Sequence, residues 1–157
     1  MTGSGTVGMI DVSEKPVIRR EAEAAGIIVL KPATIDRIRS REIRKGDPFQ
    51  VAEIAAMQAA KQTHLLIPHC HQIALDMVNV VFSIEDRSVE ARCTVLARAS
   101  TGVEMEALVG VTSALNTIWD MVKYLEKDEH GRYPETLIKD VRVTRKEKGG
   151  PSGGATG

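Results

Sequence analysis

The segment LIPHCH (66–71) gathers side chains that can bind metals or exchange protons. It lies at a boundary between predicted elements, where functional sites often form. Zinc needs three or four ligands in tetrahedral geometry, but in an extended stretch His69 and His71 would face one way and Cys70 the other. Even with His64 upstream this spacing is a poor zinc signature, and the histidines can equally be surface or hydrogen-bonded residues.

Carboxylates and a lysine recur along the stretch that begins GVEMEA. Glu104 and Glu106 open it, and Asp120 and Lys123 lie three residues apart further along. At 100° per residue, Asp120 falls nearly opposite an apolar stripe, and Lys123 falls on the same side as Asp120. Such an exposed pair contributes little to stability, but a carboxylate and an ammonium that a partner surface buries can act as acid and base. The residues alone leave both interpretations open.

Basic residues form two clusters, at 37–45 and at 142–148. Such clusters are commonly solvated surface, and no aromatic residues that would stack on bases are interleaved with them, which disfavours binding of single-stranded nucleic acid. Lys and Arg in a pocket also neutralise phosphate oxygens, so a phosphorylated small molecule fits them. The spacing GxGxxG occurs at residues 3–8, but no strand is predicted before it and no helix directly after it, and the sequence contains no P-loop pattern. The sequence therefore does not support a Rossmann or Walker nucleotide site.

The overall composition excludes several classes of protein. The chain has 157 residues, of which 43% are hydrophobic and 27% charged, with 21 basic and 21 acidic residues. This length suits one domain, and the balanced charge disfavours general nucleic-acid affinity. No apolar run approaches the ~20 residues of a membrane span, so we expect a cytoplasmic protein without membrane partners. Cys70 and Cys93 are expected to be free thiols.

Two segments carry strong periodic patterns. Residues 88–99 alternate between apolar and polar side chains, and with the apolar run 73–84 before them they predict an antiparallel hairpin. From Leu108 to Leu125, apolar residues recur at steps of three and four, which predicts a helix that cannot continue past Gly131 and Pro134.

Weaker patterns complete the order of elements. We expect strands at 17–30 and 137–145, a helix at 48–65, and a shorter helix at 34–44 that Thr34 caps. The resulting order, β-α-α-β-β-α-β, predicts an α+β protein with a ferredoxin-like split βαβ fold, in which helices pack on one face of an antiparallel sheet.

Both ends are rich in Gly, Ser or Pro and poor in apolar residues. Such segments cannot bury enough surface to offset the entropy of ordering. We therefore expect a flexible N-terminus at 1–8, a single domain at 9–148, and a flexible Gly-rich tail at 149–157.

Five segments share their letters and their order with one known family. They are MIDVSEKP (9–16), KGDPFQVAEIAAMQAAKQT (45–63), LIPHCH (66–71), TGVEMEALVGV (101–111) and IWDMVKYLEK (118–127). Together they resemble the cyclic pyranopterin monophosphate synthase family, also called the molybdenum cofactor biosynthesis protein C family. The resemblance implies a ferredoxin-like lyase that assembles as a homohexamer, a trimer of dimers, with its catalytic sites at the dimer interface.

The resemblance also implies a reaction. The family converts 3′,8-cyclo-7,8-dihydroguanosine 5′-triphosphate to cyclic pyranopterin monophosphate and pyrophosphate, opening and rebuilding rings by proton transfers before a cyclic phosphate closes. It implies no redox cofactor, and the sequence does not decide whether magnesium accompanies the triphosphate.

Site residues follow from the resemblance position by position. It implies the catalytic residues Asp120, Lys123, Lys45 and Lys146, the substrate-binding residues His69, Cys70, His71, Glu104, Met105, Glu106, Lys61 and Arg20, and no metal ligand. Arg19 takes the place of Arg20 if the register of the first strand is shifted by one residue. The basic side chains would hold the triphosphate, and a lysine crowded by other cations would have a lowered pKa and exchange protons near neutral pH. Glu104, Glu106 and His71 would hydrogen-bond the purine-derived edges and ribose hydroxyls.

The chain departs from the family pattern at three places. The second lysine of the family's C-terminal motif is displaced, so either Lys146 or Lys148 takes the catalytic position; we favour Lys146 because a strand places a group more accurately than a Gly-rich segment. His69 and Gln72 replace the common Leu and Pro, which leaves the pocket shape open. The segment 127–136 is longer than usual and predicts a surface excursion.

Two other functions stay open at this point. A non-enzymatic ferredoxin-like oligomer that binds a phosphorylated ligand for regulation would need basic residues, but it would not need Asp120 and Lys123 as an acid–base couple. A metal-binding protein that uses His64, His69 and the residues after it would carry stoichiometric zinc.

Overall fold

The computed structural model describes residues 7–149, and most of the two expected flexible ends, 1–6 and 150–157, lies outside the described residues. The elements are β1 (Ile18–Val29), α1 (Pro32–Arg39), α2 (Pro48–Lys61), α3 (Thr63–Leu66), β2 (Met77–Ile84), β3 (Ser88–Ala99), α4 (Glu104–Glu126) and β4 (Leu137–Lys148). Within this part of the chain, no helix is both long enough and apolar enough to cross a membrane.

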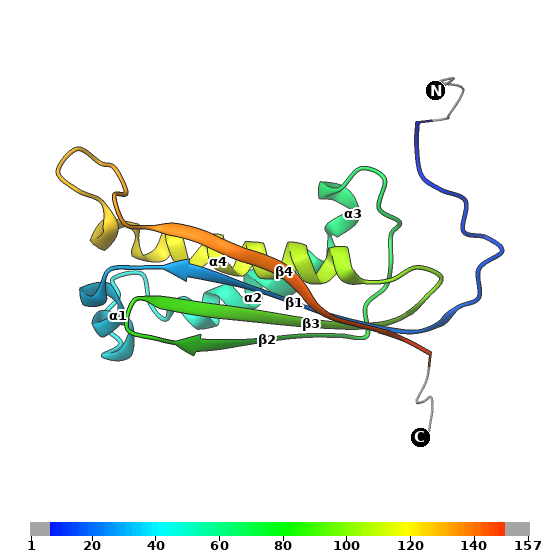
Figure 1. The fold of residues 1–157 in the computed structure, drawn as a ribbon, viewed down its shortest axis with the longest axis horizontal. Helices are drawn as coiled ribbons and strands as arrows, with labels where there is room; N and C mark the ends of the chain where they lie inside the picture. Colours follow the sequence, from blue (N-terminus) through cyan, green and yellow to red (C-terminus); the bar gives the residue numbers. More distant parts are fainter. Residues whose placement is uncertain (1–6, 150–157) are drawn as a thin grey trace.

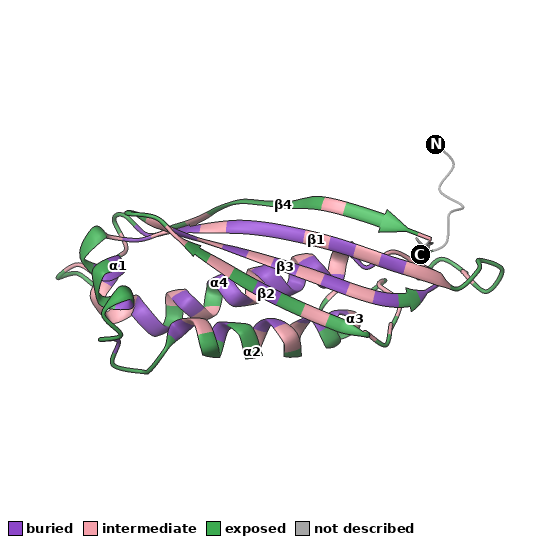
Figure 2. Ribbon diagram, turned by 90° about the horizontal axis from the view of Figure 1, so that it is seen from below, coloured by how far each residue is buried: buried purple, intermediate pink, exposed green. Residues whose placement is uncertain are grey.

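The strands form one sheet in the order β2-β3-β1-β4, and every neighbouring pair is antiparallel. Figure 1 shows α4 running along the length of this sheet, and Figure 2 shows α2 and α4 together on one of its faces. The α+β fold with helices on one face of an antiparallel sheet is therefore confirmed, and its strand order is that of a ferredoxin-like split βαβ fold.

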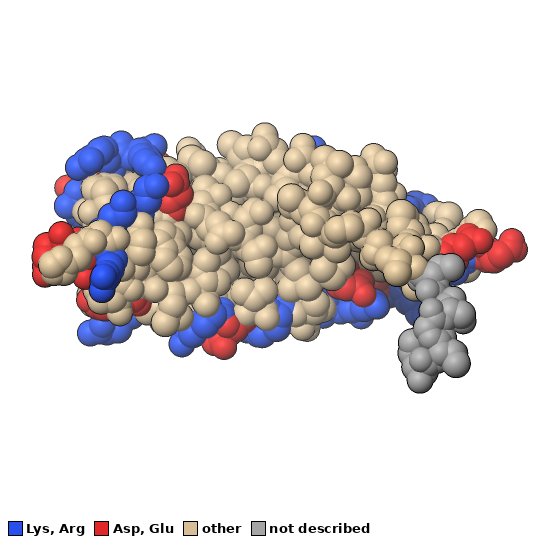
Figure 3. Space-filling model, turned by 90° about the horizontal axis from the view of Figure 1, so that it is seen from above, with Lys and Arg blue, Asp and Glu red and all other residues tan. Residues whose placement is uncertain are grey.

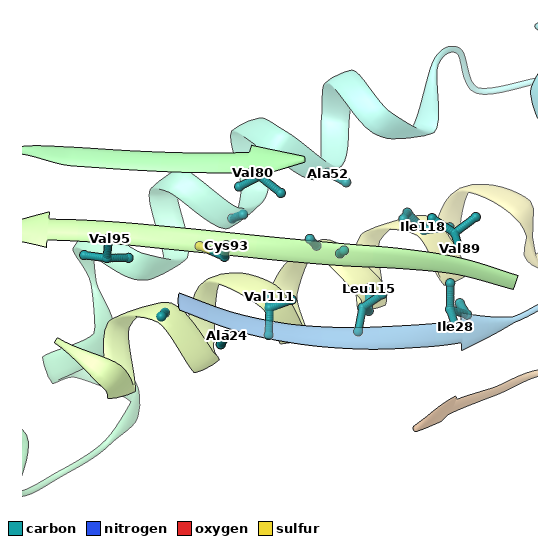
Figure 4. Packing of buried hydrophobic residues seen from close by; sticks show 14 of the residues in the cluster. Ala24, Ile28, Ala52, Val80, Val89, Cys93, Val95, Val111, Leu115 and Ile118 are labelled. Carbon is teal, nitrogen blue, oxygen red and sulfur yellow. The ribbon is translucent and has the colours of Figure 1, made fainter. Parts of the chain in front are cut away.

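The core lies between the sheet and these two helices. Every second residue of β3 from Val89 to Ala99 is buried, as a strand with one covered face requires. Side chains from β1, β3, α2 and α4 meet in one layer, which Figure 4 shows, and each fully buried Val, Leu or Ile contributes ~1.5–3 kcal/mol relative to its exposed state. The predicted hairpin and the long predicted helix are confirmed, except that β2 begins at Met77 rather than at residue 73.

Small residues let α4 approach its neighbours closely. Gly110 of α4 packs so tightly that a Cβ atom there would lie 2.7 Å from Cys93 Sγ of β3 and 3.5 Å from the carbonyl oxygen of Ala56. The buried residues of α2 are correspondingly small, namely Pro48, Ala52, Ala56 and Ala60. This contact determines how near α4 lies to both the sheet and α2.

The predicted cap of the first helix was wrong. Helix α1 begins at Pro32, its N-cap residue is Lys31, and no side chain caps it. Thr34 instead donates from Oγ1 to the buried Glu126 carboxylate of α4, which also accepts from the Lys31 backbone N–H at 3.1 Å and from Thr136 Oγ1 at 2.7 Å. A residue far along the chain thus takes the place of a local cap.

Three predicted boundaries also differ. Helix α1 ends at Arg39 rather than residue 44, because Arg41 adopts a left-handed backbone with φ of 59°. Helix 48–65 is divided at Gln62, which separates α2 from the short α3. Strand β4 continues beyond residue 145 to Lys148, because β1 offers pairing partners as far as Arg20.

We predict that Gly110→Ala lowers the free energy of unfolding by up to ~2 kcal/mol, since overpacking costs ~1–3 kcal/mol and the better helix propensity of Ala returns ~1 kcal/mol. In a Cys93→Ala background the clash is removed, and the same substitution should be neutral or stabilising. Chemical denaturation of the four proteins at one protein concentration measures this. Equal losses in both backgrounds would contradict the packing argument.

Candidate active site

One set of predicted site residues meets around the start of α4. We call it the Glu104 group, and it consists of Arg20, Cys70, Glu104, Glu106 and Lys146. Lys146 Nζ donates to Glu104 Oε2 at 2.9 Å, and Cys70 Sγ donates to Glu106 Oε2 at 3.7 Å. Strand β4, the turn after α3 and helix α4 thus contribute side chains to one place.

The alternation of β4 explains why Lys146 reaches this group. Its neighbour Arg145 donates to Glu21 Oε2 at 2.6 Å, and Glu21 precedes the buried core residue Ala22 on β1. Arg145 therefore lies on the open face of the sheet, and Lys146 lies on the face that the helices cover. Lys148, two residues on, shares that face but ends the strand.

Arg20 and Gly102 shape the turn that leads into α4. The buried Arg20 guanidinium donates to the carbonyl oxygens of Ala99 at 3.3 Å and Ser100 at 3.0 Å, which hold the end of β3. Gly102 then lies against the Glu104 carboxylate, since a Cβ atom there would collide with Oε1. The backbone and the charged side chains are therefore packed directly on each other.

The two glutamates of the Glu104 group differ electrostatically. Burial raises the pKa of Glu106, which is 2% exposed. Burial also acts on Glu104, but the hydrogen bond from Lys146 and the charges of Lys146 and Arg20 outweigh it and lower the pKa of Glu104. Among residues 7–149, Glu104 Oε1 and Glu106 Oε1 are buried side-chain oxygens without a hydrogen-bond partner, so each has unused capacity to accept a hydrogen bond.

Cys70 is held as a thiol. Burial, followed by the negative charge of Glu106, raises the pKa of Cys70 to about 11. A thiol with this pKa stays protonated near neutral pH and acts as a hydrogen-bond donor rather than as a nucleophile.

A second set of site residues lies near the end of α4. We call it the Asp120 group, and it consists of Lys45, Asp120 and Lys123. Lys45 Nζ lies 3.1 Å from Asp120 Oδ2, and Lys123 Nζ lies 3.0 Å from Asp120 Oδ1. The Asp120 side chain remains 58% exposed. This arrangement is an ion-paired carboxylate between two ammonium groups at the surface of the chain.

The charges in the Asp120 group stabilise one another. Hydrogen bonds from Lys123 and Lys45 lower the pKa of Asp120, and the hydrogen bond to Asp120 raises the pKa of Lys123. The direction for Lys123 is opposite to the lowering that we expected from crowding by cations. In a single chain the carboxylate is the closer influence, so Lys123 stays charged.

The two groups lie far apart in one chain. Glu104 and Asp120 are separated by 16 residues of α4, which corresponds to ~24 Å along the helix axis. Figure 1 shows the two ends of α4 at opposite ends of the sheet, one near α3 and the other near α1. A single chain therefore does not bring all of the predicted site residues together.

The other predicted ligand-binding residues lie at the Glu104 end. Residues 67–70 form a turn rather than an extended stretch, closed by the Cys70 N–H to Ile67 O hydrogen bond of 3.0 Å. His71 Nε2 lies 2.7 Å from Ile10 O, and exposed His69 joins it in lining a hollow of about 310 Å³. In the described part of the chain, no three His, Cys, Asp or Glu side chains are grouped to hold a metal ion.

Two features complete this end of the molecule. Lys61, the last residue of α2, lines a separate hollow of about 520 Å³ with residues 72–75, and Met105 lies between the two glutamates on α4. The N-terminal segment, through Ile10 and Lys15, lines the hollow with the histidines. We did not predict this contact, although the motif MIDVSEKP had marked the segment.

The sequence of this chain is similar to those of known proteins. A profile of the MoaC family matches residues 9–149. The chain is 51% identical over 146 residues to "Probable cyclic pyranopterin monophosphate synthase" of Archaeoglobus fulgidus, covering 93% of this chain and 94% of that protein. It is 52% identical over 142 residues to the protein of the same name from Pyrococcus abyssi, covering 90% and 89%.

One similar protein carries a different name. "Probable cyclic pyranopterin monophosphate synthase accessory protein" of Methanothermobacter thermautotrophicus is 51% identical over 142 residues, which cover 90% of this chain and 89% of that protein. The match to the family profile and these three similarities extend over nearly the whole sequence, termini apart. The chain belongs to the MoaC family.

Proposed function

We propose that the chain is a cyclic pyranopterin monophosphate synthase, a cytoplasmic lyase of molybdenum cofactor biosynthesis. Its substrate is 3′,8-cyclo-7,8-dihydroguanosine 5′-triphosphate, and its products are cyclic pyranopterin monophosphate and pyrophosphate. The observation that carries the proposal is the identity of about half, over about nine-tenths of the chain, with proteins of that name. The two hydrogen-bonded groups on α4 supply chemistry that fits this reaction.

The cationic side chains suit a triphosphate. Lys45, Lys61 and Lys123 carry charges that can neutralise phosphate oxygens and stabilise the charge on departing pyrophosphate. Asp120, with its lowered pKa, is a carboxylate at neutral pH and can accept a proton from the substrate. The adjacent Lys123 ammonium can donate a proton to the substrate in return. No redox cofactor takes part in the proposed reaction, because the ring rearrangement is a sequence of proton transfers.

The Glu104 group suits the purine-derived rings. The free oxygens of Glu104 and Glu106 can accept hydrogen bonds from N–H and O–H groups, and the Cys70 thiol can donate one. Lys146 and Arg20 bring positive charge to the same place. We assign substrate binding to this group, with Lys146 as its catalytic lysine.

A complete site requires a second subunit. The ~24 Å between the groups along α4 exceeds the reach of any side chain, so we propose that the Glu104 group of one subunit faces the Asp120 group of another. From Ala107 to Trp119, α4 carries no charged residue, and Figure 3 shows a broad face free of charged side chains between the two ends of the molecule. Such a face suits burial by another subunit, and we propose the homohexamer, a trimer of dimers, that the family resemblance implies.

The first prediction concerns activity. Incubation of the protein with the cyclised GTP derivative should release pyrophosphate and form the pyranopterin product. Asp120→Asn, nearly isosteric, should lower kcat by ~100-fold or more while KM changes little, because a proton-transfer group contributes ~10²–10⁴. Asp36→Asn, at an exposed position of α1, is the control and should remain active. Absence of product, or weaker binding with kcat intact, would favour the regulatory ligand-binding protein.

The second prediction separates two lysines. Lys146→Ala should abolish most product formation at saturating substrate, because Lys146 donates to Glu104 within the site. Lys148→Ala should keep kcat within about two-fold of wild type, since Lys148 ends the strand one residue beyond Glu147 and is exposed. Severe loss in the Lys148 variant alone would reverse this assignment.

The third prediction tests the shared site. Asp120→Asn and Lys146→Ala should each be inactive, but mixed oligomers, co-expressed with two different tags, should regain activity. A dimer of one subunit of each kind has one site with both original residues and one with neither, so random pairing restores ~25% of the sites. No recovery in verified mixed oligomers would place both residues of a working site in one chain.

A further inference from the structure

Lys45 of the Asp120 group lies in the loop of residues 40–47 between α1 and α2, and both ends of this loop are fixed by local bonds. After α1, left-handed Arg41 lets the Glu42 N–H donate to Arg37 O at 2.9 Å. Before α2, Asp47 Oδ1 accepts from the Phe49 N–H at 2.9 Å and so caps the helix. In the middle of the loop, Ile43 is buried and its carbonyl oxygen accepts from the Gly46 N–H at 3.1 Å, whereas Arg44 bonds to a residue outside the loop.

The partner of Arg44 is Tyr124 of α4. The Arg44 backbone N–H donates to Tyr124 Oη at 2.7 Å, and the Arg44 guanidinium lies over the ring, with Cζ 4.3 Å from the centroid. Tyr124 follows Asp120 by four residues and therefore lies on the same side of α4, about one turn further on. Adjacent loop residues 44 and 45 are thus held by neighbouring residues of one helix face.

The hydrogen bond from the Arg44 backbone to the Tyr124 hydroxyl matters because the ion pair between Lys45 and Asp120 is weak by itself. The Lys45 side chain is 45% exposed, and a long exposed lysine loses side-chain entropy when it is held against a carboxylate. A backbone anchored one residue away limits the positions from which Lys45 Nζ can reach the two oxygens that it contacts, Asp120 Oδ2 and Asp120 O. Anchoring therefore shifts the loop toward the conformation in which the Asp120 group is assembled.

We infer that Tyr124 is a positioning residue of the active site, whose hydroxyl holds the 40–47 loop so that Lys45 stays in contact with Asp120. The inference rests on the proposed function for its effect on catalysis. Tyr124 itself is not assigned any contact with substrate, and it acts through the Arg44 backbone and Lys45.

Tyr124→Phe tests the inference, because it removes only the hydroxyl and keeps the ring under Arg44. Loss of one hydrogen bond should lower kcat about three- to ten-fold, with KM within about two-fold of wild type and the melting temperature little changed. Hydrogen exchange measured by mass spectrometry should show faster exchange in peptides that cover residues 41–47, and unchanged exchange in the core strands.

Tyr133→Phe is the matched control. It removes the hydroxyl of the other tyrosine, whose ring packs edge-on against Trp119 with centroids 5.1 Å apart, and it should leave exchange at 41–47 unchanged. Unchanged exchange at 41–47 in Tyr124→Phe would overturn the inference. Faster exchange with unchanged kcat would overturn it as well, because Lys45 would then not need the anchor.

The exchange experiment needs no substrate. If wild-type protein forms no product, the proposed function fails, whereas exchange at residues 41–47 still shows whether Tyr124 holds the loop. If wild-type protein is active and Tyr124→Phe behaves like wild type in both measurements, the positioning role fails and the proposed function stands.

Discussion

The close contact of α4 with the sheet and with α2 determines most of this structure. At Gly110 there is no room for even one more carbon atom, because Cys93 Sγ and the Ala56 carbonyl lie directly against the helix. A helix packed this closely over its length has little freedom to slide or bend. Since α4 carries residues of both charged groups, this contact holds the two groups at a constant separation.

That separation explains why the chemistry points beyond a single chain. Loops can move and side chains can extend, but ~24 Å along one helix cannot be shortened by either. A second copy, by contrast, can bring the other group close without any internal change. The proposed second subunit would cover the face without charged side chains that lies between the two ends of the molecule.

The two groups also differ in what determines their charges. Around Glu104, burial dominates: it raises the pKa of Glu106 and of the Cys70 thiol and leaves carboxylate oxygens free for a ligand. Around Asp120, exposed ion pairs dominate, and they keep the carboxylate and Lys123 charged. Closure by a neighbour would remove water from the Asp120 group and strengthen these interactions, which a single chain leaves screened.

Several features follow from the sequence by itself. The alternation in β3 and the three-four spacing in α4 determined those elements, because such periods report which side of an element is covered. The order of elements then determined the sheet with helices on one face, and the five motifs determined the family. Which residues belong to the site came from the motifs alone, since spacing could not distinguish Asp120 and Lys123 from a solvated ion pair.

Other features were decided only by the tertiary structure. Thr34 faces the buried Glu126 rather than capping α1, and Lys148 belongs to β4 because β1 extends beside it. The contacts of Tyr124 with Arg44 and of Lys146 with Glu104 likewise join residues that are 80 and 42 positions apart in the sequence. The physical reason is common to all of these: hydrogen bonds and ion pairs between distant segments depend on how elements pack, and local periodicity carries no information about that packing.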